Sequence, residues 1–198
     1  MEPNVEIRRL FELMPASGRM MAKIISRPEQ AKVIDASFPL PWQWERPIYI
    51  NFDLWRRLTK PQRDLLLLQT VSWLIAVKWF QPHPYQGILL VGLLGGLVEF
   101  LQQDAVGVVM AGGLATLAGY RIWSVNRSQQ SQLNADLSAI EVAQRRGYSQ
   151  TESAQALLSA IETVAKLEGR AALNFTELIR CQNLRAIAGL SAVGVPED

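Results

Sequence analysis

Cysteine and histidine are almost missing from this sequence, which limits the chemistry that it supports. Among its 198 residues there is one cysteine, Cys181, and one histidine, His83. A disulfide within the chain is therefore impossible, and a zinc site built from several cysteines or histidines is excluded. Cys181 falls in a helical pattern, so we expect a small buried apolar residue there. The sequence predicts no bound metal and no cofactor.

Basic residues are missing from the middle of the chain. None of the 20 Lys and Arg residues lies between Lys78 and Arg121. Two apolar stretches fall within this gap, 17 residues over 85–101 and 19 residues over 105–123. As α-helices they would be roughly 25–28 Å long, close to the thickness of a bilayer core. The gap therefore predicts a transmembrane helical hairpin over 85–123, and a buried hairpin in a soluble helical bundle is the alternative.

The basic residues that flank the hairpin predict its orientation. They stand at its two outer ends and are missing from the turn, so the positive-inside rule places both termini in the cytoplasm. The N-terminus has no apolar core and does not look like a secretory signal. Small residues recur at a spacing that lets helices approach closely. The positions expected to pack in this way are Gly92, Gly96, Ala115 and Gly119.

The segments on either side of the hairpin mix polar and apolar residues. Segment 1–80 is predicted to be α+β, and segment 126–198 is predicted to be helical. Stretches rich in Ile, Val, Phe and Tyr and bounded by proline predict a small three-stranded sheet, and they cover 19–26, 31–38 and 47–51. The fold class is therefore α+β and mostly helical, with a transmembrane helical hairpin.

Capping residues mark where the helices start. Thr59 precedes a helix expected over about 61–79, with a glutamine at the position that completes a capping box. Ser149 and Asn174 each stand three residues before a glutamate, which predicts two more helix starts. Gly147 suits the end of the helix before them, because glycine readily ends a helix.

A series of short motifs surrounds the predicted hairpin. Residues 58–68 read Leu-Thr-Lys-Pro-Gln-Arg-Asp-Leu-Leu-Leu-Leu, directly before Gln-Thr-Val-Ser-Trp at 69–73. Gln-Leu-Asn-Ala-Asp follows the hairpin at 132–136. In this order, and with the strand-like stretch 36–50, the motifs resemble the HtpX-like membrane metallopeptidases of the gluzincin group. The resemblance implies gluzincin-like helices around a former peptidase cleft.

The zinc ligands of that family are missing from this chain. The resemblance places Gln69, Trp73 and Gln132 at the ligand positions, and Thr70 where the family has its catalytic glutamate. Asp136 alone matches the family, which implies that it supports the ligands from behind. An amide is a poor zinc ligand and an indole only donates its N–H. We therefore predict a pseudoprotease that is not an enzyme.

Two further segments read Leu-Met-Pro-Ala-Ser-Gly-Arg-Met at 13–20 and Pro-Gln-Arg-Asp-Leu-Leu at 61–66. Through them the whole chain is similar to a cyanobacterial family of proteins with a domain of unknown function. That resemblance implies an integral protein of a cyanobacterial membrane, the thylakoid or the plasma membrane. It implies no activity.

The leading hypothesis is a catalytically inactive, membrane-anchored metallopeptidase-like protein. It would act as a binding factor, or in assembly or quality control, for membrane protein complexes such as those of photosynthesis. Its partners would be membrane proteins, held by edge-strand pairing along 47–51, and the lipid bilayer. A net charge of +2 gives no reason to expect nucleic acid. The alternatives are a permanent accessory subunit of a photosynthetic complex, an active peptidase with an unusual site, and a soluble interaction module.

Overall fold

The computed structural model describes residues 2–39, 43–77 and 129–190, together with six isolated positions between 91 and 120. The chain divides into one unit made of residues 1–77 and 132–198, and a second made of residues 78–131. Each unit is considered by itself.

No helix in the described ranges is long and apolar enough to cross a membrane. The predicted hairpin over 85–123 lies outside the described residues, except for those six positions, and it stays a prediction. The same holds for the packing positions Gly92, Gly96, Ala115 and Gly119.

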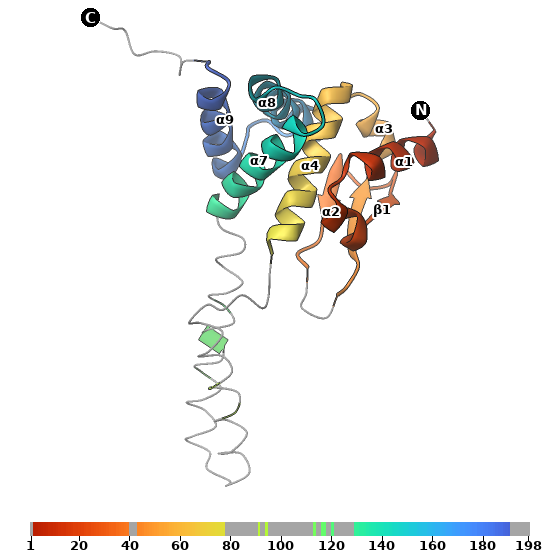
Figure 1. The fold of residues 1–198 in the computed structure, drawn as a ribbon, viewed down its shortest axis with the longest axis vertical. Helices are drawn as coiled ribbons and strands as arrows, with labels where there is room; N and C mark the ends of the chain where they lie inside the picture. The colour runs from red at the N-terminus through yellow and green to blue at the C-terminus, as the bar shows by residue number, and fades with distance from the viewer. Residues whose placement is uncertain are drawn as a thin grey trace, which may run out of the picture. The chain divides into compact units, whose positions relative to one another are not determined.

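The described elements alternate between helices and a small sheet in the N-terminal half and are helical in the C-terminal half (Figure 1). The helices are α1 (Pro3–Leu13), α2 (Ala16–Met21), α3 (Phe52–Trp55), α4 (Lys60–Ala76), α7 (Gln129–Gln144), α8 (Gln150–Leu167) and α9 (Phe175–Ile187). The strands are β1 (Ala22–Ser26), β2 (Ile34–Ala36) and β3 (Arg46–Ile50). The predicted class, α+β and mostly helical with a three-stranded sheet, is confirmed.

The order of the strands corrects one expectation. The sheet runs β1-β3-β2, with β1 parallel to β3 and β2 antiparallel to it. The stretch 47–51 was expected to offer a free edge, and this is wrong because β3 has a hydrogen-bonded neighbour on each side. The strand expected from Arg19 begins only at Ala22, because α2 continues to Met21. The sheet has two edge strands, β1 and β2, and β2 is the one that lines a cavity together with α4, α8 and α9.

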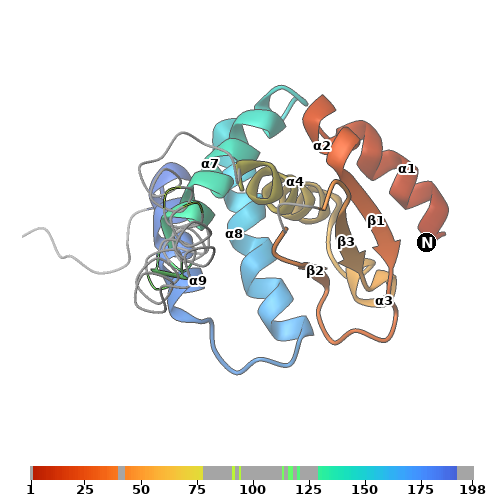
Figure 2. The same ribbon diagram turned by 90° about the horizontal axis from the view of Figure 1, so that it is seen from below.

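Helix α4 is the centre of the first unit, which explains why it is apolar nearly all round. Leu67 and Val71 pack in the apolar cluster of the sheet, α1 and α3, whereas Leu65 and Leu68 pack with α7, α8 and α9. Figure 2 shows α4 lying between the sheet on one side and α7 and α8 on the other. Residues before and after the predicted hairpin therefore share one core.

The predicted caps are confirmed. The Oγ of Ser149 accepts a hydrogen bond from the N–H of Glu152 at 3.1 Å, and Asn174 does the same for Glu177 at 2.9 Å. Gly147 follows α7 with a φ of +94°, a conformation that glycine adopts without strain. These local signals therefore set where α7 ends and where α8 and α9 begin.

Gly18 lies where α2 packs closely against α4. A Cβ at this position would lie 2.6 Å from the Cγ1 of Val71, which is 1% exposed. We expect Gly18→Ala to lower the free energy of unfolding by about 1–3 kcal/mol, the usual cost of overpacking. Chemical denaturation measures this. The double variant Gly18→Ala/Val71→Ala should lose less than the sum of the two single variants, and strict additivity would contradict the clash.

Candidate functional site

Of the five positions that the sequence resemblance relates to a metallopeptidase site, four line one cavity of about 400 Å³. Gln69, Thr70 and Trp73 come from one face of α4, and Gln132 comes from the first turns of α7. We call this cavity the amide pocket. Its rim is formed by β2, the end of α8 and the start of α9. The structure therefore brings together residues that stand on opposite sides of the predicted hairpin.

Two glutamine side chains bridge the pocket. The Nε2 of Gln69 donates a hydrogen bond to the Oε1 of Gln132 at 2.9 Å, and Gln69 is buried. Each amide is thus used once. Within the described residues, no further hydrogen bond engages the Oε1 of Gln69 or the Nε2 of Gln132. One acceptor and one donor thus remain for a ligand, and these are the two kinds of group with which a peptide pairs.

Thr70 and Trp73 have structural contacts. The Oγ1 of Thr70 donates to the carbonyl of Leu66 at 2.9 Å, so its hydroxyl is engaged within α4. The indole of Trp73 lies against Phe38, with ring centroids 6.3 Å apart and planes at 60°. Its Nε1 is buried with no hydrogen-bond partner in the part of the chain that the structure describes. This indole therefore forms an apolar wall of the pocket, and its N–H is a donor that a ligand could use.

Asp136 lies behind the pocket wall and not in its lining. It is fully buried, and Arg180 of α9 holds both of its oxygens, through Nε at 2.8 Å and Nη2 at 2.7 Å. Burial raises the pKa of this carboxyl, and the guanidinium of Arg180 opposes that shift. Arg180 itself lines the pocket. This pairing was not predicted, because 44 residues separate the partners and no motif includes both of them.

The charged side chains at the rim are paired with each other. Lys32 lies 2.7 Å from Asp35, and Arg170 bridges Glu168 at 3.0 Å and Glu177 at 2.7 Å. Burial acts to raise the pKa of Glu177, but the hydrogen bonds from Arg170 and the Asn174 backbone lower it overall. Since positive and negative groups balance, the rim offers no strong preference for a charged ligand.

The edge of β2 opens onto the same pocket, which Ile34, Asp35 and Ala36 help to line. The carbonyl of Val33 accepts from the N–H of Asn51 at 3.1 Å, while Ile34 stands opposite Ile50. In an antiparallel pair this pattern makes Ile34 a non-hydrogen-bonded position. The backbone groups of Ile34, and of Ala36 two residues on, therefore point away from β3 toward the open side.

The start of β2 is fixed by α8. The Oε1 of Glu168, which follows the last turn of α8, accepts a hydrogen bond from the N–H of Val33 at 3.0 Å. Glu168 is held in turn by Arg170. The open edge of β2 is therefore held in place from both sides, by β3 and by the end of α8. A rigid edge loses little conformational entropy when it binds a partner.

The donors around the amide pocket do not fit zinc. Catalytic zinc requires three ligands from His, Cys, Asp or Glu, whereas Gln69, Trp73 and Gln132 offer two amides and an indole. Over the described ranges there is no group of three or more His, Cys, Asp or Glu placed to hold a metal ion. What the pocket can do chemically is donate and accept hydrogen bonds and cover an apolar side chain.

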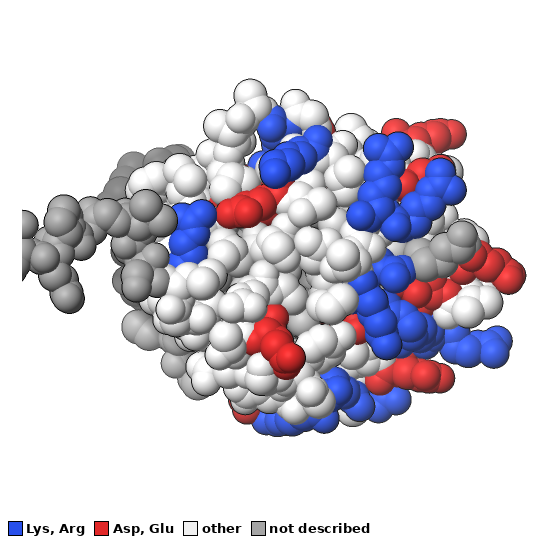
Figure 3. All heavy atoms as spheres, turned by 90° about the horizontal axis from the view of Figure 1, so that it is seen from above, with Lys and Arg blue, Asp and Glu red and all other residues white. Residues whose placement is uncertain are grey.

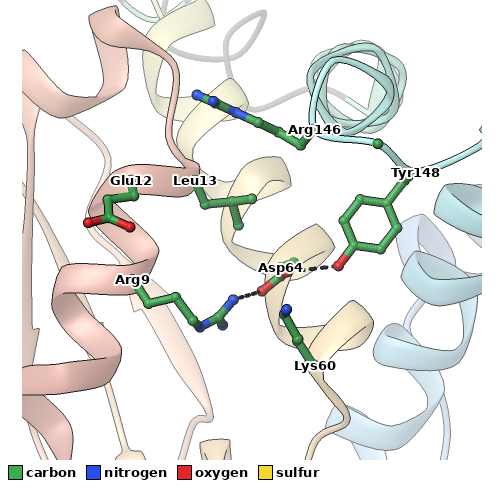
Figure 4. A pocket seen from close by; sticks show the side chains of 8 residues that line it. Arg9, Glu12, Leu13, Lys60, Asp64, Arg146 and Tyr148 are labelled. Atoms are coloured by element: carbon green, nitrogen blue, oxygen red, sulfur yellow. Dashed lines mark hydrogen bonds and ion pairs between the residues drawn. The ribbon is translucent and has the colours of Figure 1, made fainter.

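A second cavity, of about 350 Å³, lies between α1, α4 and the turn after α7 (Figure 4). At its base the buried Asp64 accepts hydrogen bonds from the Nη1 of Arg9 at 2.6 Å and from the Oη of Tyr148 at 2.8 Å. Burial and this carboxylate raise the pKa of Tyr148 to about 12. The phenol therefore stays protonated at neutral pH, and the cluster ties three elements together without a free base.

Comparisons with known proteins address the family of the chain. No solved structure matches it. The thylakoid membrane protein slr1949 of Synechocystis sp. is 28% identical over 162 residues, which cover 80% of this chain and 76% of that protein. The family model described as "Protein of unknown function (DUF3318)" matches residues 8–148. These findings do not show the metallopeptidase resemblance, which stays a hypothesis, but they fit the expected cyanobacterial family. Because the model covers most of the chain, including Gln69, Gln132 and Asp136, the chain belongs to the DUF3318 family.

Proposed function

We propose that this protein is a catalytically inactive binding protein of the thylakoid membrane, acting in the assembly or quality control of membrane protein complexes. The observation that carries the proposal is the amide pocket beneath the open edge of β2. The similarity to a thylakoid membrane protein supports the location. Integral anchoring with both termini in the cytoplasm is part of the proposal and derives from the distribution of basic residues.

The ligand that fits this site is an extended segment of another protein. Such a segment would add to the sheet along β2, using the outward backbone groups of Ile34 and Ala36. Alternate side chains of an added strand point to the same face, so one of them would enter the pocket beside Trp73. The free acceptor of Gln69 and the free donor of Gln132 suit a peptide group. The balanced charges of the rim favour an uncharged main chain over an ionic ligand.

The second unit supports a membrane partner. Four large apolar side chains among its isolated described positions are helical and 63–72% exposed: Val91, Leu94, Leu117 and Tyr120. Exposed apolar surface of this kind is covered by lipid or by another protein. The unit would therefore contribute contacts within the bilayer, with the small residues Gly92, Gly96, Ala115 and Gly119 allowing close helix packing.

A metallopeptidase-like origin is proposed on the meeting of Gln69, Trp73 and Gln132. They stand in the order that the family motifs have, and they converge on one pocket next to an edge strand. A peptidase cleft that has exchanged its ligands for amides keeps the geometry for holding a substrate strand. It lacks the groups that would activate water.

The test of this function is recovery of the tagged full-length protein from its native membranes in mild detergent, with the products resolved by size. We expect it to migrate with partial or immature membrane complexes. Recovery in fixed proportion with one mature complex would instead support a permanent accessory subunit. A loss of partner recovery in the Ala36→Pro variant described next would connect the result to the edge of β2.

Ala36→Pro probes the strand-addition step. The N–H of Ala36 points to the open side, so proline there removes a donor to the partner and leaves the bonds to β3 intact. We expect at least about a tenfold loss of partner recovery, the effect of one or two backbone hydrogen bonds. Ala36→Val is the matched control, since it keeps the N–H and suits a strand. Equal recovery with the two variants would show that β2 does not bind the partner.

A further inference from the structure

Five of the eight large apolar side chains that are exposed in the described part of the first unit lie at one end of it. The two most exposed of them are Trp44, at 90%, and Met20, at 86%. The group also includes Met21, Phe175 and Leu178. We call these five residues the apolar end.

The sheet places Met20, Met21 and Trp44 beside the end of α4. Ala22 pairs with Arg46 at the start of β1 and β3, so the residues just before each lie together. The guanidinium of Arg46 donates to the carbonyls of Leu74 and Val77, the latter at 3.3 Å. Figure 1 shows α2 and α4 finishing at this lower end.

The start of α9 lies at the same end. Asn174 and Glu177, which precede and follow Phe175 in its first turn, line the amide pocket together with Trp73 and Gln132. Phe175 and Leu178 therefore belong to the part of the unit that contains the last turn of α4 and the beginning of α7. Figure 3 shows the opposite end, where charged side chains gather on the side of α1 and α3 and the middle of the face is largely uncharged.

We infer that the apolar end of the first unit rests in the interface of the lipid bilayer, with Trp44 and Met20 at the level of the lipid headgroups. The inference rests on the proposed membrane anchoring. The chain leaves this unit after Val77 and returns by Gln132, and the 54 residues between contain the two long apolar stretches. Both connections lie at the apolar end, and tryptophan is enriched at membrane interfaces.

This placement specifies the partner of the amide pocket. The amide pocket is lined by Trp73, Gln132 and the start of α9, which also lie beside the apolar end. The open edge of β2 would then lie within reach of the membrane surface. The segment that it binds is the extended stretch of a membrane protein directly next to one of its transmembrane helices.

The test measures the depth of single positions in the full-length protein, reconstituted into vesicles of phosphatidylcholine and phosphatidylglycerol. In a Cys181→Ala background, Trp44→Cys carries a polarity-sensitive fluorophore at the apolar end. Val5→Cys is the control, because Val5 is also exposed and apolar but lies next to Glu6, which pairs with Arg63 at the other end of α4. A lipid with a nitroxide on its headgroup quenches fluorophores at the surface.

We expect several-fold stronger quenching and a blue-shifted emission at position 44 than at position 5. Equal quenching at the two positions, with protein retained in vesicles after a carbonate wash, would overturn this inference and leave the anchoring intact. Removal of the protein by carbonate would overturn both. Because partner recovery is measured separately in detergent, the assembly role can fail or succeed independently of this result.

Discussion

Replacing Arg180 with methionine is expected to lower the free energy of unfolding by about 3–5 kcal/mol, the cost of leaving one partner of a buried ion pair unpaired. Asp136 is fully buried and both of its oxygens are held by this guanidinium. Methionine fills a similar volume, so the loss reports the uncompensated carboxylate and not a cavity. Urea denaturation of the full chain in detergent measures it.

Protonation should relieve part of this loss. Burial already raises the pKa of Asp136, and removing Arg180 removes the group that opposes the shift. As the pH falls through this raised pKa, the carboxyl becomes neutral and the difference between variant and wild type should shrink. A difference that does not change with pH would show that Arg180 acts through packing alone.

Two controls separate the charge from the fold. The double variant Asp136→Leu/Arg180→Met should recover most of the lost stability, because an apolar pair can replace a buried ion pair at little cost. Arg145→Met removes the partner of Glu141 on the surface of α7, where both side chains are more than half exposed. It should cost no more than about 1 kcal/mol.

The second large effect is expected from introducing the ligands that the proposed metallopeptidase resemblance implies. The triple variant Gln69→His/Trp73→His/Gln132→Glu should bind Zn²⁺, which the amides and the indole of the natural chain do not ligate well. Without metal we expect a loss of roughly 2 kcal/mol, since the indole that packs on Phe38 is removed and polar groups replace it. At a hundredfold excess over its dissociation constant, zinc should return about 2.7 kcal/mol.

Thermal melting with and without zinc measures both parts of this expectation. The double variant Gln69→His/Trp73→His has two of the three ligands and should gain clearly less from the metal. If zinc stabilises neither variant, Gln69, Trp73 and Gln132 do not converge as metal ligands would. The proposed metallopeptidase-like origin would then be wrong, although the peptide-binding role of β2 would stand on its own test.

Local signals predicted the elements well. The capping boxes at Ser149 and Asn174 and the glycine after α7 are confirmed, because a cap is made between residues three or four positions apart. The three strands were also found by composition. Their order was not, and the wrong expectation of a free edge on β3 shows why: edge and centre differ only in which strand lies beside them.

The sequence indicated some of the residues that line the amide pocket, whereas their role as former metal-site positions stays a prediction. Motif order indicated Gln69, Trp73 and Gln132, and the structure places them in one pocket. Thr70 is engaged with its own helix, and Asp136 lies behind the wall. Two interactions were not predicted: the pairing of Arg180 with Asp136, and the hydrogen bond from the N–H of Val33 to Glu168. Each joins residues that are far apart in sequence and share no motif.

The sequence by itself determined the α+β class, the helix starts, the lack of zinc ligands and the gap in basic residues, since each depends on residue types or on neighbours along the chain. Only the tertiary structure decided that β2 is an edge strand beside the amide pocket, that Arg180 pairs with the buried Asp136, and that the apolar end lies near the same pocket. Those features depend on contacts between α4, α7 and α9 and on strand order. Such contacts form only when the apolar faces of the helices and the sheet are buried together in the folded chain, so neighbours along the sequence do not indicate them.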